Sequence, residues 1–226
     1  MSKRKIFFIG IDGADWRIIM PLLQDGKLKG LSEIYDNGIK GTLEALPPVT
    51  LPSWNSILTG RNPGWHGIFD HVIKHKGDKY TIAFSQYRKV PTIWERASRM
   101  GLTSIVINDP TSYPPLKIKG IFLTGFLTPS DSKNFIYPQH LTEEINKIIG
   151  TYWPNIPPEF FIALRHKKYD VAYKIACTFI RKIGSLSLYL MKNYPWDLFY
   201  VFFTATDTIQ HFFWTEKGLK YIAQAY

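Results

Sequence analysis

The segment at residues 197–204, DLFYVFFT, constrains the fold more than any other part of this sequence. It is apolar at nearly every position instead of at alternate positions, so both faces of the strand that it predicts must be buried. Strands of this kind lie inside parallel sheets that carry helices on both faces. The segment therefore predicts an α/β protein with a mostly parallel sheet.

Strand-like and helix-like segments alternate along the rest of the chain, as they do in parallel α/β sheets. Apolar runs predict further strands, the first of them buried, at 5–11, 41–46, 102–108 and 120–124. Helical periodicity predicts helices at 22–37, 91–100, 138–149 and 159–194, the last with breaks, and a helix that begins at 209. We find no repeat or linker, so one domain over residues 1–226 is expected, with helices on both faces of its sheet.

Composition narrows the class of protein. The sequence is 45% hydrophobic and 20% charged, which is typical of a folded protein. Its single cysteine, Cys177, argues against an internal disulfide and a cysteine-rich zinc module. No uncharged apolar run reaches the roughly 18 residues of a membrane span. A soluble, cytoplasmic protein is the default expectation.

The formal net charge of +10 would suit nucleic acid, a membrane surface or small anionic substrates. The lysines and arginines are scattered, however, and the only dense group, RHKK at 165–168, lies on a predicted helix whose face solvent would cover. The thirteen tyrosines and seven tryptophans form no base-stacking motif. We therefore expect neither a nucleic acid nor a membrane as partner.

The run at 47–71, PPVTLPSWNSILTGRNPGWHGIFDH, places the hydroxyl of Thr50 at the start of a short predicted helix. Pro52 is typical of the first turn of a helix, and Gly60 is typical of the left-handed residue that ends one. The N–H groups and the positive dipole end of this helix would face the Thr50 oxygen. Such a helix start favours an anion such as phosphate.

Polar residues follow the predicted strands at the ends where parallel α/β sheets carry their functional groups. Asp12 follows the first strand, Thr50 the second and Asp207 the strand at 197–204. His211 comes four residues after Asp207, on the same face of a helix, so this pair could bind a metal ion. Each residue alone is more often a cap, a turn residue or a surface hydrogen-bond partner; their joint placement favours a function.

Three segments, IGIDGAD, the run at 47–71 and WDLFYVFFTATDTIQHFFW, resemble the alkaline phosphatase superfamily in its type I phosphodiesterase/nucleotide pyrophosphatase branch. Two more, VPTIWERASRMGLTSIVINDPTSYPP and FLTGFLTP, are similar to prokaryotic members, so the likeness runs through nearly the whole chain. The resemblance implies an alkaline phosphatase-like core. It also implies a hydrolase of phosphodiester or pyrophosphate bonds that acts on a small phosphate-containing substrate such as a nucleotide.

The same resemblance implies two divalent metal ions, commonly zinc, with manganese as the alternative. By position, Asp12 and Thr50 would bind one ion, and Asp207 and His211 would bind the other. Thr50 would also be the nucleophile, because a metal ion can lower the pKa of its hydroxyl, and a phospho-enzyme would form on it. His71 stands where the family often has an asparagine that contacts the substrate phosphate, and a histidine could still donate a hydrogen bond there.

The resemblance further implies three ligands, an Asp-His pair and one more His, downstream of the T-D-x-x-x-H segment. The 226-residue sequence ends before them, which leaves two recognisable ligands for each ion, whereas a catalytic zinc normally has three. We therefore expect the amino-terminal part of such an enzyme, a truncated domain that is incomplete at its C-terminal end. In isolation it would be weakly active or inactive, and it could associate with a complementary chain or a second copy.

Two other functions remain open. One is a related phosphomutase or phosphonate hydrolase, which would share the metal ligands, although these phosphomutases usually carry serine in place of Thr50. The other is a non-catalytic module that binds an anion or a partner. Metal analysis would separate the enzymes from the non-catalytic module, because near-stoichiometric zinc or manganese favours an enzyme.

Overall fold

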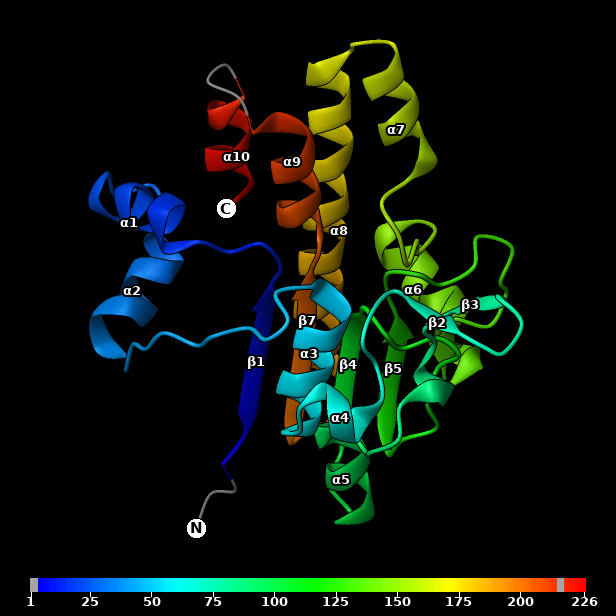
Figure 1. Ribbon diagram of the computed structural model, residues 1–226. Coiled ribbons are helices and arrows are strands. Elements are labelled where there is room, and N and C mark those ends of the chain that lie inside the picture. Colours follow the sequence, from blue (N-terminus) through cyan, green and yellow to red (C-terminus); the bar gives the residue numbers. More distant parts are fainter. Residues whose placement is uncertain (1–3, 215–217) are drawn as a thin grey trace.

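The computed structural model describes residues 4–214 and 218–226. At its centre lies a five-stranded sheet in the order β1-β7-β4-β5-β6 (Figure 1). The strands are β1 (Ile6–Ile11), β7 (Leu198–Phe203), β4 (Ser104–Asp109), β5 (Gly120–Thr124) and β6 (Ile136–Tyr137). The pairs β1–β7, β7–β4 and β4–β5 are parallel, and β6 pairs antiparallel with β5. The sheet is therefore mostly parallel, as predicted.

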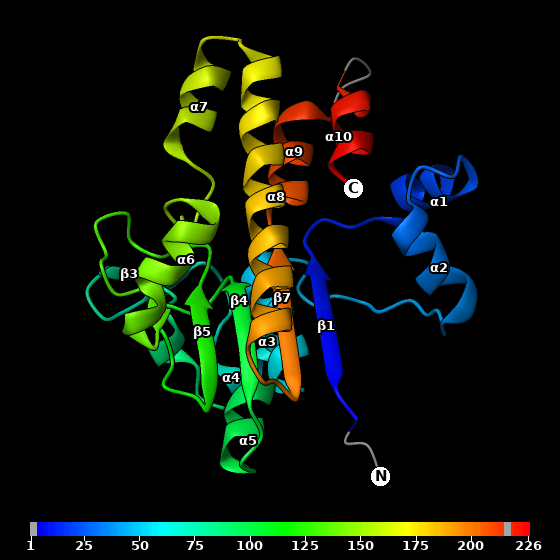
Figure 2. The same ribbon diagram turned by 180° about the vertical axis from the view of Figure 1, so that it is seen from behind.

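Helices cover both faces of this sheet (Figures 1 and 2). One face carries α3 (Thr50–Thr59), α4 (Pro63–His66) and α5 (Ile93–Arg99), and the opposite face carries α6 (Thr142–Ile149) and the long α8 (Tyr169–Asn193). Alternate residues of the strands divide between the two cores: Val106 and Tyr200 pack with α3 and α5, whereas Ile105 and Val201 pack with α6 and α8. The α/β architecture expected from the sequence is confirmed.

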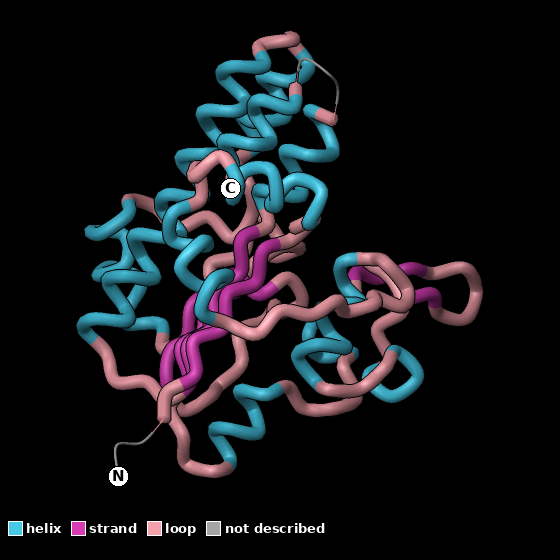
Figure 3. Tube along the Cα trace, turned by 90° about the vertical axis from the view of Figure 1, so that its left-hand side faces the viewer, coloured by secondary structure: helices cyan, strands magenta, loops and turns pink. Residues whose placement is uncertain are grey.

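The remaining elements lie around this core. They are α1 (Trp16–Gln24), α2 (Lys29–Asn37), α7 (Pro158–Arg165), α9 (Ala205–Phe213), α10 (Leu219–Ala225) and the hairpin β2 (Val72–Lys74) and β3 (Tyr80–Ile82), with short 3-10 turns at Ser85–Tyr87 and Gln139–Leu141. Figure 3 shows the hairpin standing apart from the central sheet. None of the helices in the described residues combines the length and the apolar character that a membrane crossing requires.

The strand β7 is the clearest match between sequence and structure. Five of its six residues are buried, and the sixth, Phe203, is half-buried. The strand pairs with β1 on one side and with β4 on the other. The strand at Gly120–Thr124 lies where the sequence predicts it, and the segment predicted as a helix with breaks at 159–194 divides into α7 and α8.

Four predictions about single elements are wrong. The first strand, β1, is at the edge of the sheet and not buried, because no described strand pairs with its outer side, and Ile6, Phe7 and Ile9 are 40% to 55% exposed. Residues 41–46 form an exposed extended segment instead of a strand. The helix predicted at 22–37 is two helices, α1 and α2, and α9 begins at Ala205, four residues earlier than expected.

Candidate functional site

Thr50 is the first residue of α3, as the sequence predicts. Pro52 lies in the first turn, and Gly60, with φ of 65°, takes the left-handed conformation that ends the helix. The half-buried Thr50 hydroxyl donates a long hydrogen bond of 3.5 Å to Oδ2 of Asp12. The hydroxyl therefore lies at the positive end of the helix dipole and beside a carboxylate.

Asp12 directly follows β1 and is only 7% exposed. Its backbone N–H donates to the carbonyl of Phe203 in β7, and its Oδ1 accepts a 2.9 Å hydrogen bond from the indole Nε1 of Trp54. Burial raises the pKa of Asp12 to about 6, the hydrogen bond from Trp54 opposes this rise, and the charge of Asp207 adds to it. A carboxylate held in this way favours a nearby cation.

Asp207 and His211 occupy one face of α9, with His211 Nε2 3.3 Å from Asp207 Oδ2. The His211 side chain is 71% exposed and that of Asp207 is 29% exposed. Burial raises the pKa of Asp207, and the charges of His211 and His71 lower it. This pair is therefore open to solvent on the His211 side.

The loop after β1 rests directly on the first turn of α9. Thr206 Oγ1 donates to the Asp12 carbonyl at 2.7 Å, and Gln210 Nε2 donates to the Gly13 carbonyl at 2.8 Å. Gly13 has φ of 67°, and a Cβ there would lie 2.9 Å from the Cα of Asp207. This close approach brings Asp12 and Asp207 together across 195 positions of sequence.

His71 lies just before β2, with 39% of its side chain exposed. Its Nδ1 is 3.2 Å from Asp70 Oδ1, and its ring packs edge-on against Phe126, with the ring centroids 6.1 Å apart. Its charge lowers the pKa of Asp207. In residues 4–214 and 218–226, no three His, Cys, Asp or Glu side chains form a group that could hold a metal ion.

The structure also contains a buried polar network behind Thr50 that sequence reasoning missed. Arg88, whose side chain is 2% exposed, donates to Asn55 Oδ1 at 3.1 Å and to the Thr111 carbonyl at 3.3 Å. Asn55 Nδ2 in turn donates to the Leu51 carbonyl and to Thr111 Oγ1, both at 2.8 Å. The network ties the helix that starts at Thr50 to the loop that follows β4.

Two carboxylates face Arg88. Glu95 Oε2 is 3.7 Å from the guanidinium and also accepts from the N–H and hydroxyl of Thr92, which completes a capping box at the start of α5. Asp109, at the end of β4, is fully buried; burial raises its pKa to about 7, and the Arg88 charge opposes this rise. The guanidinium is thus the positive centre of a desolvated cluster.

His66 joins α4 to α3. The N–H of Ile68 donates to His66 Nδ1 at 3.1 Å, so Nε2 carries the proton and donates to Ser56 Oγ at 3.0 Å. The side chain is completely buried, and burial lowers the pKa of His66. Its role is therefore structural.

The family model described as "Type I phosphodiesterase / nucleotide pyrophosphatase" matches residues 6–225. No curated protein matches the chain in sequence.

Two solved structures share the fold at low identity. Phosphonoacetate hydrolase from Sinorhizobium meliloti 1021, in complex with phosphonoformate, has a TM-score of 0.62 and 13% identity, over 99% of this chain and 51% of its own. Murine ectonucleotide pyrophosphatase/phosphodiesterase 5, an inactive variant with alanine in place of a threonine and in complex with AMP, has a TM-score of 0.58 and 14% identity, over 98% of this chain and 49% of its own. The chain spans about half the length of these proteins.

Proposed function

We propose a hydrolytic function from one premise: the chain belongs to the type I phosphodiesterase/nucleotide pyrophosphatase family, whose model matches residues 6–225. Its fold is that of the alkaline phosphatase superfamily. The family and the similar structures support an enzyme that hydrolyses phosphoester, pyrophosphate or phosphonate bonds. Our finer proposal is a metal-dependent hydrolase of phosphodiester or pyrophosphate bonds with Thr50 as its nucleophile.

The observation that carries this proposal is the position of the Thr50 hydroxyl, at the start of α3 and 3.5 Å from the buried Asp12 carboxylate. The hydrogen bond to Asp12 orients the hydroxyl oxygen. The N-terminus of α3 attracts the anionic phosphate. The Thr50 oxygen forms a bond to phosphorus while the leaving group departs with the electron pair of its own bond. Water then attacks the phosphorus and breaks its bond to the Thr50 oxygen, which releases a phosphate monoester, and a proton from this water restores the Thr50 hydroxyl.

The proposal of bound divalent cations rests on the residue types at the site, because carboxylate, hydroxyl and imidazole groups are ligands of such ions. Carboxylates at Asp12 and Asp207 lie close together, and the Thr50 hydroxyl and the His211 imidazole complete two pairs of oxygen and nitrogen ligands. We propose zinc, with manganese as the alternative. When bound, such ions lower the pKa of a hydroxyl and stabilise charge on the reacting phosphate. Because each ion has two ligands from these residues, we expect slow turnover by this chain.

The proposed substrate is a small phosphate-containing molecule such as a nucleotide. The similar structures hold AMP and phosphonoformate. We propose that His71, whose charge lowers the pKa of Asp207, donates a hydrogen bond to the substrate phosphate. A complementary chain or a second copy is a further proposed partner, supported by the unpaired outer side of β1 in the described residues.

A related phosphonate hydrolase is the second candidate function. It is favoured by the phosphonoacetate hydrolase, which resembles this chain in fold at a TM-score of 0.62. The two candidates differ in the bond that is broken, P–O in the first and P–C in the second. Substrates of both kinds therefore belong in the same test.

The test is the hydrolysis of bis(4-nitrophenyl) phosphate and of phosphonoacetate by the 226-residue chain, with zinc or with manganese. We expect slow, metal-dependent release of nitrophenol. Thr50→Ala should lower the rate by about 10³-fold or more, because the nucleophile is lost, whereas Thr50→Ser should retain part of it. Urea unfolding of both variants checks that the fold is kept.

Each other outcome is decisive. Equal rates for Thr50→Ala and the unsubstituted chain would show that Thr50 is not the nucleophile. Faster hydrolysis of phosphonoacetate than of the diester would favour the phosphonate hydrolase. AMP binding without turnover of either substrate, with zinc or manganese, would identify a non-catalytic anion-binding module.

A further inference from the structure

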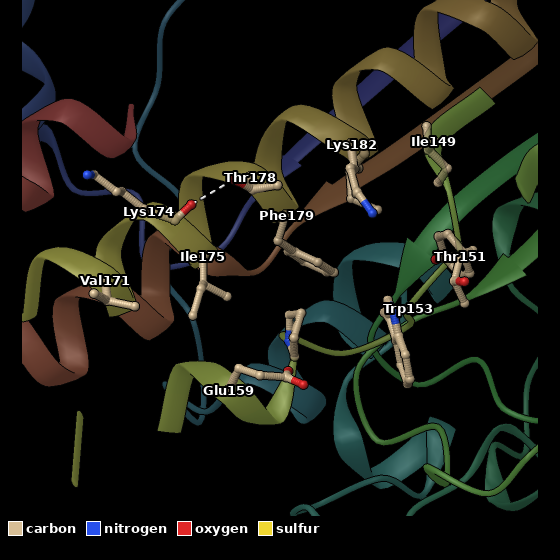
Figure 4. A pocket seen from close by; sticks show the side chains of 13 residues that line it. Ile149, Thr151, Trp153, Glu159, Val171, Lys174, Ile175, Thr178, Phe179 and Lys182 are labelled. Carbon is tan, nitrogen blue, oxygen red and sulfur yellow. Dashed lines mark hydrogen bonds between the residues drawn. The ribbon is translucent and has the colours of Figure 1, made fainter. Parts of the chain in front are cut away.

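A cavity of about 510 Å³ lies between α8 and the segment that joins α6 to α7 (Figure 4). None of the candidate site residues lines it. Its volume falls within the range of roughly 300–1,000 Å³ that is usual for small-molecule sites. The walls are mostly apolar, with Trp153 on one side and Ile175 and Phe179 of α8 on the other. An apolar chain or ring would be well matched to them.

Lys182 is the polar group that distinguishes this cavity from an ordinary apolar hollow. Figure 4 shows its ammonium turned toward the side of the cavity that carries Thr151 and Trp153. Its Nζ lies 3.4 Å from the position that a Cβ on Gly150 would take. Within the described residues it makes no hydrogen bond or ion pair, and it is half-buried. An ammonium that faces an apolar cavity and has no partner among the described residues favours an anion there.

Two other charged side chains line the cavity. Lys174 lies two turns before Lys182 on α8, but its ammonium points away from Trp153 (Figure 4). Glu159, on α7, is exposed and is the only acidic residue among the lining residues. The lining therefore carries more positive than negative charge, and Lys182 is the cation that faces inward.

We propose that this cavity binds a fatty-acid-like anion. The apolar chain would lie against Trp153 and Phe179, and the carboxylate would pair with Lys182. A head group with a single charge suits one ammonium, since no second base faces inward from the lining residues. The site is separate from the Thr50 site and does not depend on the proposed hydrolysis.

The test compares three probes that share a twelve-carbon chain, each used below its micelle concentration: laurate, dodecanol and dodecylammonium. Binding to the 226-residue chain is followed by calorimetry and by tryptophan fluorescence. We expect saturable binding of laurate, weaker binding of dodecanol and the weakest binding of dodecylammonium. Equal affinity for laurate and dodecanol, or no saturable binding of laurate, would overturn the proposal.

Substitutions locate the head group. Lys182→Gln should weaken laurate binding about tenfold or more, because a charge-assisted hydrogen bond is lost, and should leave dodecanol binding unchanged. Lys182→Arg should retain laurate binding, and Glu159→Gln should strengthen it. Lys192→Gln, the same change on the exposed last turn of α8, is the matched control and should have no effect.

Thermal unfolding of each variant establishes that it is folded. Laurate binding that is equal in Lys182→Gln and in the unsubstituted chain would contradict the assigned position of the carboxylate. Loss of laurate binding in the Lys192→Gln control would contradict it as well, because that residue lies outside the cavity.

Discussion

The two sides of the candidate site differ in how the rest of the protein supports them. On the Thr50 side, Asp12 is 7% exposed and bonded to Trp54, and α3 is tied down by Asn55 and Arg88. On the other side, His211 is 71% exposed and its ring contacts the Asp207 carboxylate at 3.3 Å. The proposed metal ligands on the two sides thus have very different surroundings: Asp12 is buried, whereas His211 is open to solvent.

This difference indicates which part of the site geometry is determined by folding alone, before a ligand binds. Buried and partly buried hydrogen bonds hold α3 and the Asp12 carboxylate in place before any ligand arrives, because an unmet buried polar group would be costly. An exposed side chain such as His211 keeps its rotamer freedom until a ligand orders it. Substitutions on the first side should therefore change stability, and substitutions on the second should change ligand binding.

The largest loss of stability is expected for Arg88→Met. Methionine keeps much of the volume but removes the charge that faces Glu95 and Asp109, and it leaves Asn55 Oδ1 without its buried donor. Removal of one member of a buried charged group costs about 3–5 kcal/mol, which urea unfolding would measure. Arg99→Met, an exposed change on the same helix as Glu95, should cost less than about 0.5 kcal/mol. A loss below about 1 kcal/mol for Arg88→Met would mean that the network does not hold α3.

Asp109→Asn should alter how stability depends on pH. Burial raises the pKa of Asp109 to about 7 from 3.8, so the folded chain keeps a proton that the unfolded chain releases. Stability therefore falls as pH rises from about 4 to 7, by about 2–3 kcal/mol between pH 5 and pH 8. The variant should lose this part of the fall, as urea unfolding at the two pH values would measure. Parallel pH dependence in both proteins would show that Asp109 is already ionised at pH 5.

Asn55→Ala should lower stability by about 1–2 kcal/mol, because Arg88 and Thr111 each lose a buried partner. If the start of α3 is then less well held, turnover should fall as well. Asn37→Ala is the matched control, since both side chains donate to the carbonyl four residues earlier but Asn37 is exposed. Urea unfolding of the pair would separate the buried network from the local hydrogen bond. Equal losses in the two variants would contradict a role for the network.

The smallest effect on stability is expected on the open side of the site. His211→Ala should change the free energy of unfolding by less than about 0.5 kcal/mol, because the side chain is 71% exposed. Zinc affinity should nevertheless fall by at least 10–100-fold, as calorimetry would measure. His140→Ala, an exposed histidine away from the site, should leave zinc affinity unchanged. Unchanged affinity in His211→Ala would remove it from the proposed ligands.

The sequence predicts correctly those elements whose structure is determined by their own residues. The strand β7 is apolar on both faces, so it had to be central, and Pro52 and Gly60 mark the helix that begins with Thr50 by local backbone preference alone. The strand β1 is just as apolar, yet it lies at an edge, with Phe7 47% exposed. Whether another strand pairs with its outer side depends on the tertiary structure, which the hydrophobic pattern of one segment does not predict.

The sequence predicts the helix that begins with Thr50 correctly, but it predicts the element before that helix wrongly. Thr50 was expected to follow a strand at 41–46, but that segment is exposed and extended, and the packing of α3 on the sheet places the hydroxyl instead. Arg88 could not be singled out, because it is one of 28 basic residues in a scattered pattern. Its burial arises only when Asn55, Glu95 and Thr111 converge from different segments.

Gly13 restricts which sequence changes a site of this kind can accept without a change in its geometry. Any side chain at position 13 would meet the backbone of α9 at Asp207, so the loop and the helix would have to separate. The gap between the Asp12 and Asp207 carboxylates is therefore controlled by a residue that offers no ligand of its own. Sequence libraries that vary only the ligands would leave this gap unchanged, whereas one added methyl group at position 13 would widen it.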